Sequence, residues 1–155
     1  MDEQVLNRNK NINRSFRKLT VWREAIGLFK FVYDKVKTLN EVSFKVRAQI
    51  EDSAFSVHSN IAEGSARRSI KDNINFNNYA LASLAENYSQ VYALLEVGLI
   101  NDEWFNEYDA KHYSLENKLI AYNKAQIKIL KSKGDWHQDY ILREEQQTYL
   151  NNENT

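Results

Sequence analysis

Apolar residues recur at alternating spacings of three and four positions in four separate stretches of this 155-residue chain. Such a spacing keeps them on one face of an α-helix, so each stretch predicts an amphipathic helix that packs nearly parallel to its neighbours. The predicted helices cover residues 18–38, 43–63, 69–98 and 102–131. Because the connections between them are short, we expect an all-α fold, an up-down-up-down four-helix bundle.

The scarcity of proline and glycine favours the same fold. The sequence contains no proline and only four glycines, which argues against a sheet built on tight turns. The absence of cysteine excludes disulfides, thiolate metal sites and cysteine nucleophiles. The first 16 residues lack the apolar stretch of a signal peptide, and no run approaches the roughly 18 apolar residues of a membrane span. We therefore expect a cytoplasmic protein that does not contact a membrane.

The bundle is flanked by two different segments. Residues 1–17 form a basic N-terminal arm, residues 18–131 the predicted bundle, and residues 132–155 a C-terminal tail. Three apolar side chains in the tail are suited to anchor one more short helix: Trp136, Tyr140 and Ile141. The chain is thus predicted to form one domain with two extensions.

The segment SNIAEGSARRS, residues 59–69, joins the second and third predicted helices. Its small polar residues and arginine pair would suit an active site or an anion-binding loop as well as a corner between helices. Gly64 fits the position just past a helix, where the chain turns left-handed, and Ser69 with Asp72 resembles a capping box. No acidic residue stands at a spacing that would orient nearby His58, so the corner is the better interpretation.

Positive charge is concentrated near the N-terminus, although the net charge of the chain is zero. Between residues 8 and 37 there are nine Lys and Arg against two acidic residues, a balance of +7. The zero total argues against a uniformly basic nucleic-acid binder, whereas the local excess favours a basic surface on the arm and first helix. The candidate nucleic-acid-binding residues are Arg14, Arg17, Lys18, Arg23, Lys30, Arg67, Arg68 and Lys71.

No metal, cofactor or catalytic centre is predicted. A di-iron site in a bundle needs two Glu-x-x-His pairs, and the nearest approach is one pair, Asp109 with His112. His112 falls on an apolar seam, where a hydrogen-bonded structural histidine is the preferred interpretation. Asn77 and Gln126 also fall on seams and are expected to fix helix register or to pair across helices. We expect no enzymatic activity.

The first and third predicted helices are apolar over more of their circumference than one bundle requires. A helix of that kind is either central or covered by another chain. We therefore expect a homo-oligomer with one of these helices at the subunit boundary. Between the second and third helices, a polar cluster is expected from Asn60, Glu63, Ser83 and Glu86.

Three segments carry a resemblance to a known family: KLTVWREAIGLFKFVYD, SVHSNIAEGSARRS and NYALASLAENYSQVYALLEVGLI. They resemble the 23S rRNA intervening-sequence protein family of bacterial four-helix bundles over roughly residues 18–131. The positions that match the family pattern are Trp22, Ala25, Asn60, Glu63, Gly64, Ser83 and Glu86. The chain departs from the pattern in having no Phe-Pro step between the first two helices and acidic residues at 51 and 52, where an arginine pair is common.

The resemblance implies a homopentameric barrel without enzymatic activity. A related group in that family serves as accessory protein to the reverse transcriptase of diversity-generating retroelements. The implied partners are therefore RNA, DNA or a nucleic-acid enzyme such as a reverse transcriptase. The alternative function that remains open is a protein-protein interaction scaffold that does not itself bind nucleic acid.

Overall fold

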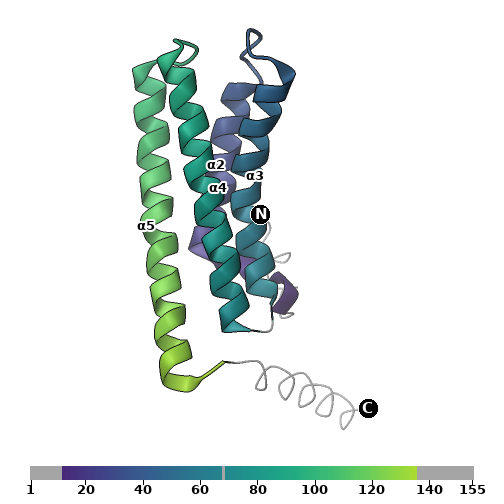
Figure 1. The fold of residues 1–155 in the computed structure, drawn as a ribbon, viewed down its shortest axis with the longest axis vertical. Coiled ribbons are helices and arrows are strands. Elements are labelled where there is room, and N and C mark those ends of the chain that lie inside the picture. Colours follow the sequence, from purple (N-terminus) through teal and green to yellow (C-terminus); the bar gives the residue numbers. More distant parts are fainter. Residues whose placement is uncertain (1–11, 68, 136–155) are drawn as a thin grey trace.

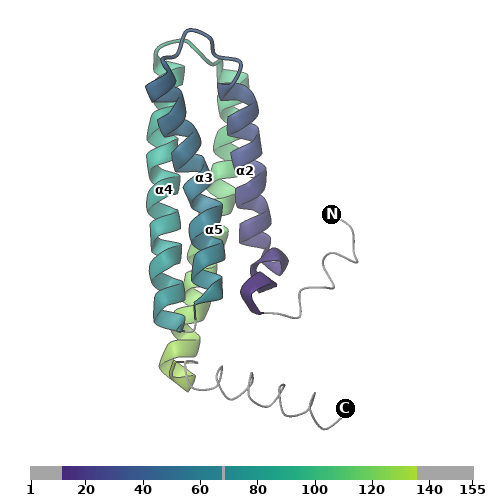
Figure 2. The same ribbon diagram turned by 90° about the vertical axis from the view of Figure 1, so that its right-hand side faces the viewer.

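The computed structural model describes residues 12–67 and 69–135, and within them the secondary structure is entirely helical. The long helices lie side by side with alternating direction (Figures 1 and 2). The elements are the 3-10 helix η1 (Ile12–Lys18) and the α-helices α2 (Thr20–Val36), α3 (Phe44–Ala66), α4 (Ile70–Glu96) and α5 (Asp102–Lys133). The predicted all-α four-helix bundle is confirmed.

Apolar side chains from all four long helices form the core. Each helix packs against its neighbours in the chain, and α2 also packs against α5, which closes the bundle. Among the fully buried side chains are Val32 of α2, Val57 of α3, Leu84 of α4 and Leu115 of α5. The spacing of three and four therefore selected the inward face of each helix correctly.

Short polar side chains begin three of the helices. Ser43 accepts a hydrogen bond from the Val46 backbone N–H at 3.4 Å, Ser69 from Asp72 at 3.3 Å, and Asn101 from Trp104 at 3.0 Å. Such caps satisfy backbone N–H groups that have no partner within the helix. The predicted capping by Ser69 is confirmed.

Gly64 does not end a helix, and this prediction was wrong. α3 continues past it to Ala66, and the positive-φ glycines of the described chain are Gly98 and Gly134. A Cβ atom at Gly64 would lie 2.8 Å from the Cβ of Phe76 and 3.2 Å from the carbonyl oxygen of Asn73. Glycine is therefore needed here because α3 and α4 approach each other too closely for any side chain.

A buried polar network connects three helices. The Asn87 amide of α4 donates to the Ile50 carbonyl at 3.0 Å and to Ser53 Oγ at 2.9 Å, both on α3. The Tyr108 hydroxyl of α5 donates to Asn87 Oδ1 at 2.9 Å. Ser53 also donates to Gln90 at 2.6 Å. Asn87 is thus the central residue of a tether between α3, α4 and α5.

The polar cluster predicted from Asn60, Glu63, Ser83 and Glu86 is not the tether that the structure contains. Asn60 donates to the Ser56 carbonyl at 2.9 Å, Glu63 pairs with Arg67, and Glu86 accepts from Gln90 at 3.1 Å. These three bonds each stay within one helix, because the side chains lie along the helix surface at a spacing of four residues. Polar contacts between α3 and α4 do occur, as expected, but residues outside the predicted cluster make them.

The interpretation of His112 as a structural residue is supported. Its Nε2 atom lies 3.0 Å from the Leu84 carbonyl oxygen, and the ring is buried between α4 and α5. Asn77 and Gln126 are buried as expected. Asn77 donates to Asn73 of its own helix at 3.1 Å instead of pairing across helices.

His58 lies in an aromatic cluster between α2 and α3, with ring centroids 5.5 Å from Phe29 and 4.6 Å from Phe55. Burial lowers the pKa of His58 below its usual value of 6.5, because the charged imidazolium is poorly solvated there. The unfolded chain therefore takes up a proton at a higher pH than the folded chain does. The resulting stabilisation is complete above pH 6.5 and is lost as the pH falls through the lowered pKa.

Replacing His58 by phenylalanine should consequently make the stability less sensitive to acid. The phenyl ring keeps the aromatic contacts but cannot take up a proton. We expect the melting temperature of the variant to fall less than that of the unmodified protein between pH 7.5 and about pH 5.5. Thermal unfolding followed by circular dichroism at several pH values measures this difference, and parallel curves would contradict it.

Candidate nucleic-acid interface

Three segments distant in sequence meet at one end of the bundle. They are η1 with the start of α2, the α3–α4 corner, and the last turns of α5, as the alternating directions of the helices in Figures 1 and 2 require. We call this the basic end and define it as residues 12–27, 60–67, 69–76 and 122–135. The corner SNIAEGSARRS, which the sequence singled out, belongs to it.

η1 holds the first candidate residues against the bundle. It packs on α3 and α2, with Ser15 Oγ 3.4 Å from Ser65 Oγ and the Phe16 ring 5.0 Å from that of Trp22. Arg14 and Lys18 are exposed on this short helix, and Arg17, between them in sequence, is partly buried. All three therefore belong to the basic end. Residues 1–11 of the predicted arm lie outside the described residues.

The two candidates on α2 are separated along the helix. Arg23 lies at the basic end, where its guanidinium donates to the Lys18 carbonyl at 3.3 Å. Lys30 is exposed but lies seven residues further along the helix, or roughly 10 Å at 1.5 Å per residue. The structure therefore groups Arg23 with η1 and places Lys30 on the side of the bundle.

At the corner, Arg67 is already engaged within the chain. It pairs with Glu63, and its guanidinium carbon lies 4.6 Å from the centroid of the Phe76 ring. These contacts hold the side chain against the end of the bundle and partly neutralise its charge. Lys71 is exposed on the first turn of α4. Arg68 lies outside the described residues.

Four lysines that the sequence analysis did not select complete the basic end. Lys124, Lys128, Lys131 and Lys133 are exposed in the last turns of α5. The first three follow a spacing of four and three, which places them in one stripe along the helix. The spacing of these lysines is visible in the sequence. Their proximity to the basic N-terminal segment depends on the antiparallel packing of α5.

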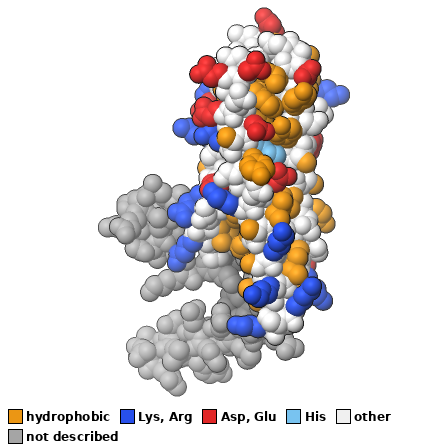
Figure 3. Space-filling view, turned by 90° about the vertical axis from the view of Figure 1, so that its left-hand side faces the viewer, with side chains coloured by type: hydrophobic (Ala, Val, Ile, Leu, Met, Phe, Trp, Pro, Cys, Tyr) orange, Lys and Arg blue, Asp and Glu red, His pale blue; other side chains and the backbone are white. Residues whose placement is uncertain are grey.

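Charge is consequently distributed unevenly along the bundle axis. The basic end contains ten Lys and Arg against four Asp and Glu, a balance of +6. The remaining described residues, 28–59 and 77–121, contain seven basic and eleven acidic residues, a balance of −4. Figure 3 shows the resulting pattern on one face, with most acidic side chains toward the upper end and lysines and arginines gathered toward the lower end.

The end of α5 is fastened to the start of α4. Asp135 accepts hydrogen bonds from the Ile70 backbone N–H at 2.7 Å and from the Ser69 hydroxyl at 2.8 Å. A carboxylate at a helix N-terminus also interacts favourably with the helix dipole. We call this pair of bonds the Asp135 clamp. It fixes the α5 lysines relative to the α3–α4 corner.

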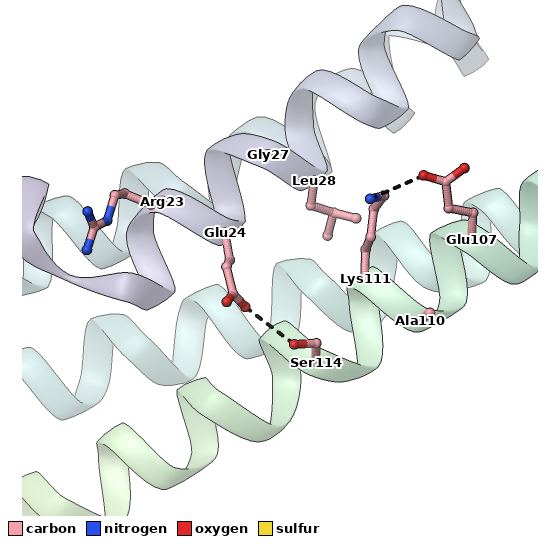
Figure 4. A pocket seen from close by; sticks show the side chains of 8 residues that line it. All are labelled: Arg23, Glu24, Gly27, Leu28, Glu107, Ala110, Lys111 and Ser114. Atoms are coloured by element: carbon pink, nitrogen blue, oxygen red, sulfur yellow. Dashed lines mark hydrogen bonds and ion pairs between the residues drawn. The ribbon is translucent and has the colours of Figure 1, made fainter. Parts of the chain in front are cut away.

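A groove of about 500 Å³ runs between α2 and α5 (Figure 4). Gly27 and Ala110 leave space in it, and Leu28 contributes an apolar wall. Its charged side chains all have partners. Glu24 pairs with Lys118, which lies outside the lining, and accepts from Ser114 at 3.5 Å, while Lys111 lies 3.2 Å from Glu107. Arg23 donates to the Lys18 carbonyl. The hydroxyl of the lining, that of Ser114, lies farther from the Glu24 carboxylate than the roughly 2.6–3.2 Å typical of an activated nucleophile and its base.

Within residues 12–67 and 69–135, no group of three His, Cys, Asp or Glu side chains is placed to hold a metal ion. The most strongly perturbed group is Tyr108, whose pKa is raised chiefly by burial. Its buried hydroxyl donates to Asn87 Oδ1 and so belongs to the polar network between α3, α4 and α5. None of the described helices combines the length and hydropathy that a membrane crossing requires.

The fold and the charged end define a small all-helical bundle protein with strong axial charge separation. The chain belongs to the 23S rRNA-intervening sequence protein family, which it matches over residues 17–121. It is also similar to the crystal structure of a protein of unknown function from the S23 ribosomal protein family of Bacteroides thetaiotaomicron. The TM-score is 0.53 at 25% identity, covering 73% of this chain and 100% of the other. None of the curated proteins matches the sequence.

Proposed function

We propose that this protein is a non-enzymatic accessory protein that binds nucleic acid, or a nucleoprotein, through the basic end of its bundle. The observation that carries the proposal is the balance of +6 at that end against −4 elsewhere in the described chain. Phosphate groups attract such a concentration of lysine and arginine without needing base-specific contacts. Membership of a family named for a ribosomal RNA intervening sequence supports the same partner class.

The α5 lysines are the side chains best suited to contact phosphates. They are exposed, and none of the ion pairs within the described part of the chain involves Lys124, Lys128 or Lys131. Their charges are therefore available, unlike that of Arg67, which is shared with Glu63. An RNA, a DNA or an enzyme that carries either, such as a reverse transcriptase, would meet these lysines together with Arg14, Lys18 and Arg23.

Gel shifts with a structured RNA and a DNA duplex at low and moderate salt test the proposal. The triple variant Lys124→Gln, Lys128→Gln, Lys131→Gln should bind more weakly at low salt. The slope of log K against log salt should fall in magnitude by about one for each phosphate contact removed. No binding of the unmodified protein at low micromolar concentration and low salt would contradict the proposal.

The matched control removes the same charge away from the basic end. Lys35, Lys37 and Lys45 lie near or in the α2–α3 connection, at the opposite end of the bundle. Replacing these three by glutamine changes the net charge equally, so binding driven by total charge would fall as much as in the α5 variant. We expect the control to retain nearly all of its affinity, because the effect depends on where the charge lies.

A protein-binding scaffold is the second candidate, and exposed aromatic side chains favour it. Tyr33, Phe55, Tyr79, Tyr92 and Tyr113 are each between 43% and 65% exposed. Aromatic residues are enriched in protein interfaces, where they bury large areas. Recovery of one protein partner after nuclease treatment, together with negative gel shifts, would select this function over nucleic-acid binding.

We also propose that the protein is a homo-oligomer, with a pentamer expected from the family resemblance. The exposed aromatic side chains provide apolar area that a second copy could cover. Light scattering on the purified full chain should give a multiple of its 18.2 kDa mass. A single species at the monomer mass across micromolar concentrations would contradict this proposal without affecting that of nucleic-acid binding.

A further inference from the structure

A group of buried amide side chains lies on α4 and α5 toward the basic end of the bundle. Four amide side chains are at least nine-tenths buried there: Asn73 and Asn77 on α4 are 1% and 0% exposed, and Asn123 and Gln126 on α5 are 6% and 7% exposed. Amides at such positions need hydrogen-bond partners, because burial removes them from bulk water.

Several contacts join these amides in one cluster. Asn77 donates to Asn73 Oδ1 at 3.1 Å, and Asn123 donates to Asn78 Oδ1 across the α4–α5 boundary at 3.0 Å. Burial raises the pKa of Tyr122, whose ring lies close to the Gln126 side chain of α5 and the Asn73 side chain of α4. The cluster therefore spans the interface between α4 and α5.

Four buried atoms of this cluster lack a good hydrogen-bond partner among the described residues. They are Asn73 Nδ2, Asn77 Oδ1, Asn123 Oδ1 and Gln126 Oε1. Exchanging the amide nitrogen and oxygen of both Asn73 and Asn77 keeps their mutual bond and again leaves one donor and one acceptor unmet. Each unmet buried group lowers the folding equilibrium constant by about tenfold, so a ligand that met these four atoms would stabilise the fold.

We infer that this amide cluster is an internal water-binding site between α4 and α5. One donor and three acceptors are unmet, and water can donate two hydrogen bonds while accepting others. A metal or ammonium ion fits poorly, since no carboxylate belongs to the cluster to balance its charge in a buried site. Each buried water makes about three hydrogen bonds, so about two molecules meet the need.

A high-resolution crystal structure of the full chain tests the inference directly. We expect ordered water within hydrogen-bond distance of Asn77 Oδ1, Asn123 Oδ1 and Gln126 Oε1. Cross-relaxation between water and the side-chain amide protons in solution should show the same site in a protein labelled at asparagine and glutamine. A dry cluster whose four atoms are all bonded to protein groups, or a bound ion in place of water, would overturn it.

Two asparagine-to-leucine substitutions provide an independent comparison. Asn77 and Asn87 are both fully buried on α4, but Asn87 has protein partners at both amide atoms. Asn77→Leu should displace water, abolish cross-relaxation at Asn73 and change the unfolding equilibrium constant by less than about tenfold. Asn87→Leu should raise the unfolding equilibrium constant by more than about thirtyfold, because it destabilises the fold.

Equal losses in the two variants would show that Asn77 is bonded to protein and not to water, which overturns the inference. If either variant fails to fold, the water contacts of the unmodified protein still decide the question. The inference concerns the interior of the bundle and does not depend on whether its surface binds nucleic acid.

Discussion

Replacing Gly64 by valine is expected to lower the free energy of unfolding by about 3 kcal/mol, the upper part of the range for overpacked cores. The first atom of any side chain would lie 2.8 Å from Phe76 Cβ and 3.2 Å from the Asn73 carbonyl oxygen. Both atoms belong to or adjoin the α4 backbone, so a rotamer change cannot relieve the clash. The two helices would have to move apart, which would weaken the packing around the corner.

Gly27 provides the matched control for this experiment. It lies in the interior of helix α2, and a Cβ atom there would meet nothing within 4 Å. Gly27→Ala should therefore raise the free energy of unfolding by about 0.5–1 kcal/mol, the usual gain in a helix interior. Urea unfolding of the two variants measures both values. An increase in stability for Gly64→Val as well would refute the close-packing explanation.

The second large effect is expected at the network centred on Asn87. Asn87→Leu removes the acceptor of the buried Tyr108 hydroxyl and the donor to Ile50 and Ser53. We expect a loss of about 2–3 kcal/mol, because a buried polar group without a partner costs about 1–3 kcal/mol. Tyr108→Phe alone should cost about 1–2 kcal/mol, since it leaves Asn87 Oδ1 without its donor.

The double variant Asn87→Leu, Tyr108→Phe distinguishes a network from two separate contacts. With both polar groups removed, neither remains unsatisfied, so the combined loss should be smaller than the sum of the single losses by about 1 kcal/mol. Urea unfolding at constant pH gives all three values. Strict additivity would mean that the hydroxyl and the amide do not depend on each other.

The helices could be predicted from the sequence because their signals are local. The bounds of the four long helices all lie within three residues of the predicted ones, and the cap at Ser69 was recognised from Asp72, three positions away. His112 was correctly assigned to the core because its position on an apolar seam is a property of one helix. Periodicity and capping require no knowledge of which helices touch.

The errors concern properties that depend on helix crossing. Glycine is common both after a helix and where two helices approach closely, so the sequence around Gly64 could not distinguish the two roles. Asn87, and not the predicted set around Asn60, tethers the helices, because only the packed arrangement decides which amide faces Tyr108. The α5 lysines were missed for the same reason: more than 90 residues separate them from Arg23, yet the fold places both at one end.

The Asp135 clamp also limits where the chain can be truncated without weakening the bundle end. The match to the family ends at residue 121 and α5 at Lys133, but the clamp requires residue 135. A fragment trimmed to the family boundary would lose the four lysines that α5 contributes to the basic end. It would also leave the Ser69 hydroxyl and the first N–H of α4 without this carboxylate. Truncated proteins intended for binding or crystallisation work should therefore extend beyond residue 135, so that the end of the bundle keeps both its charge and its fastening.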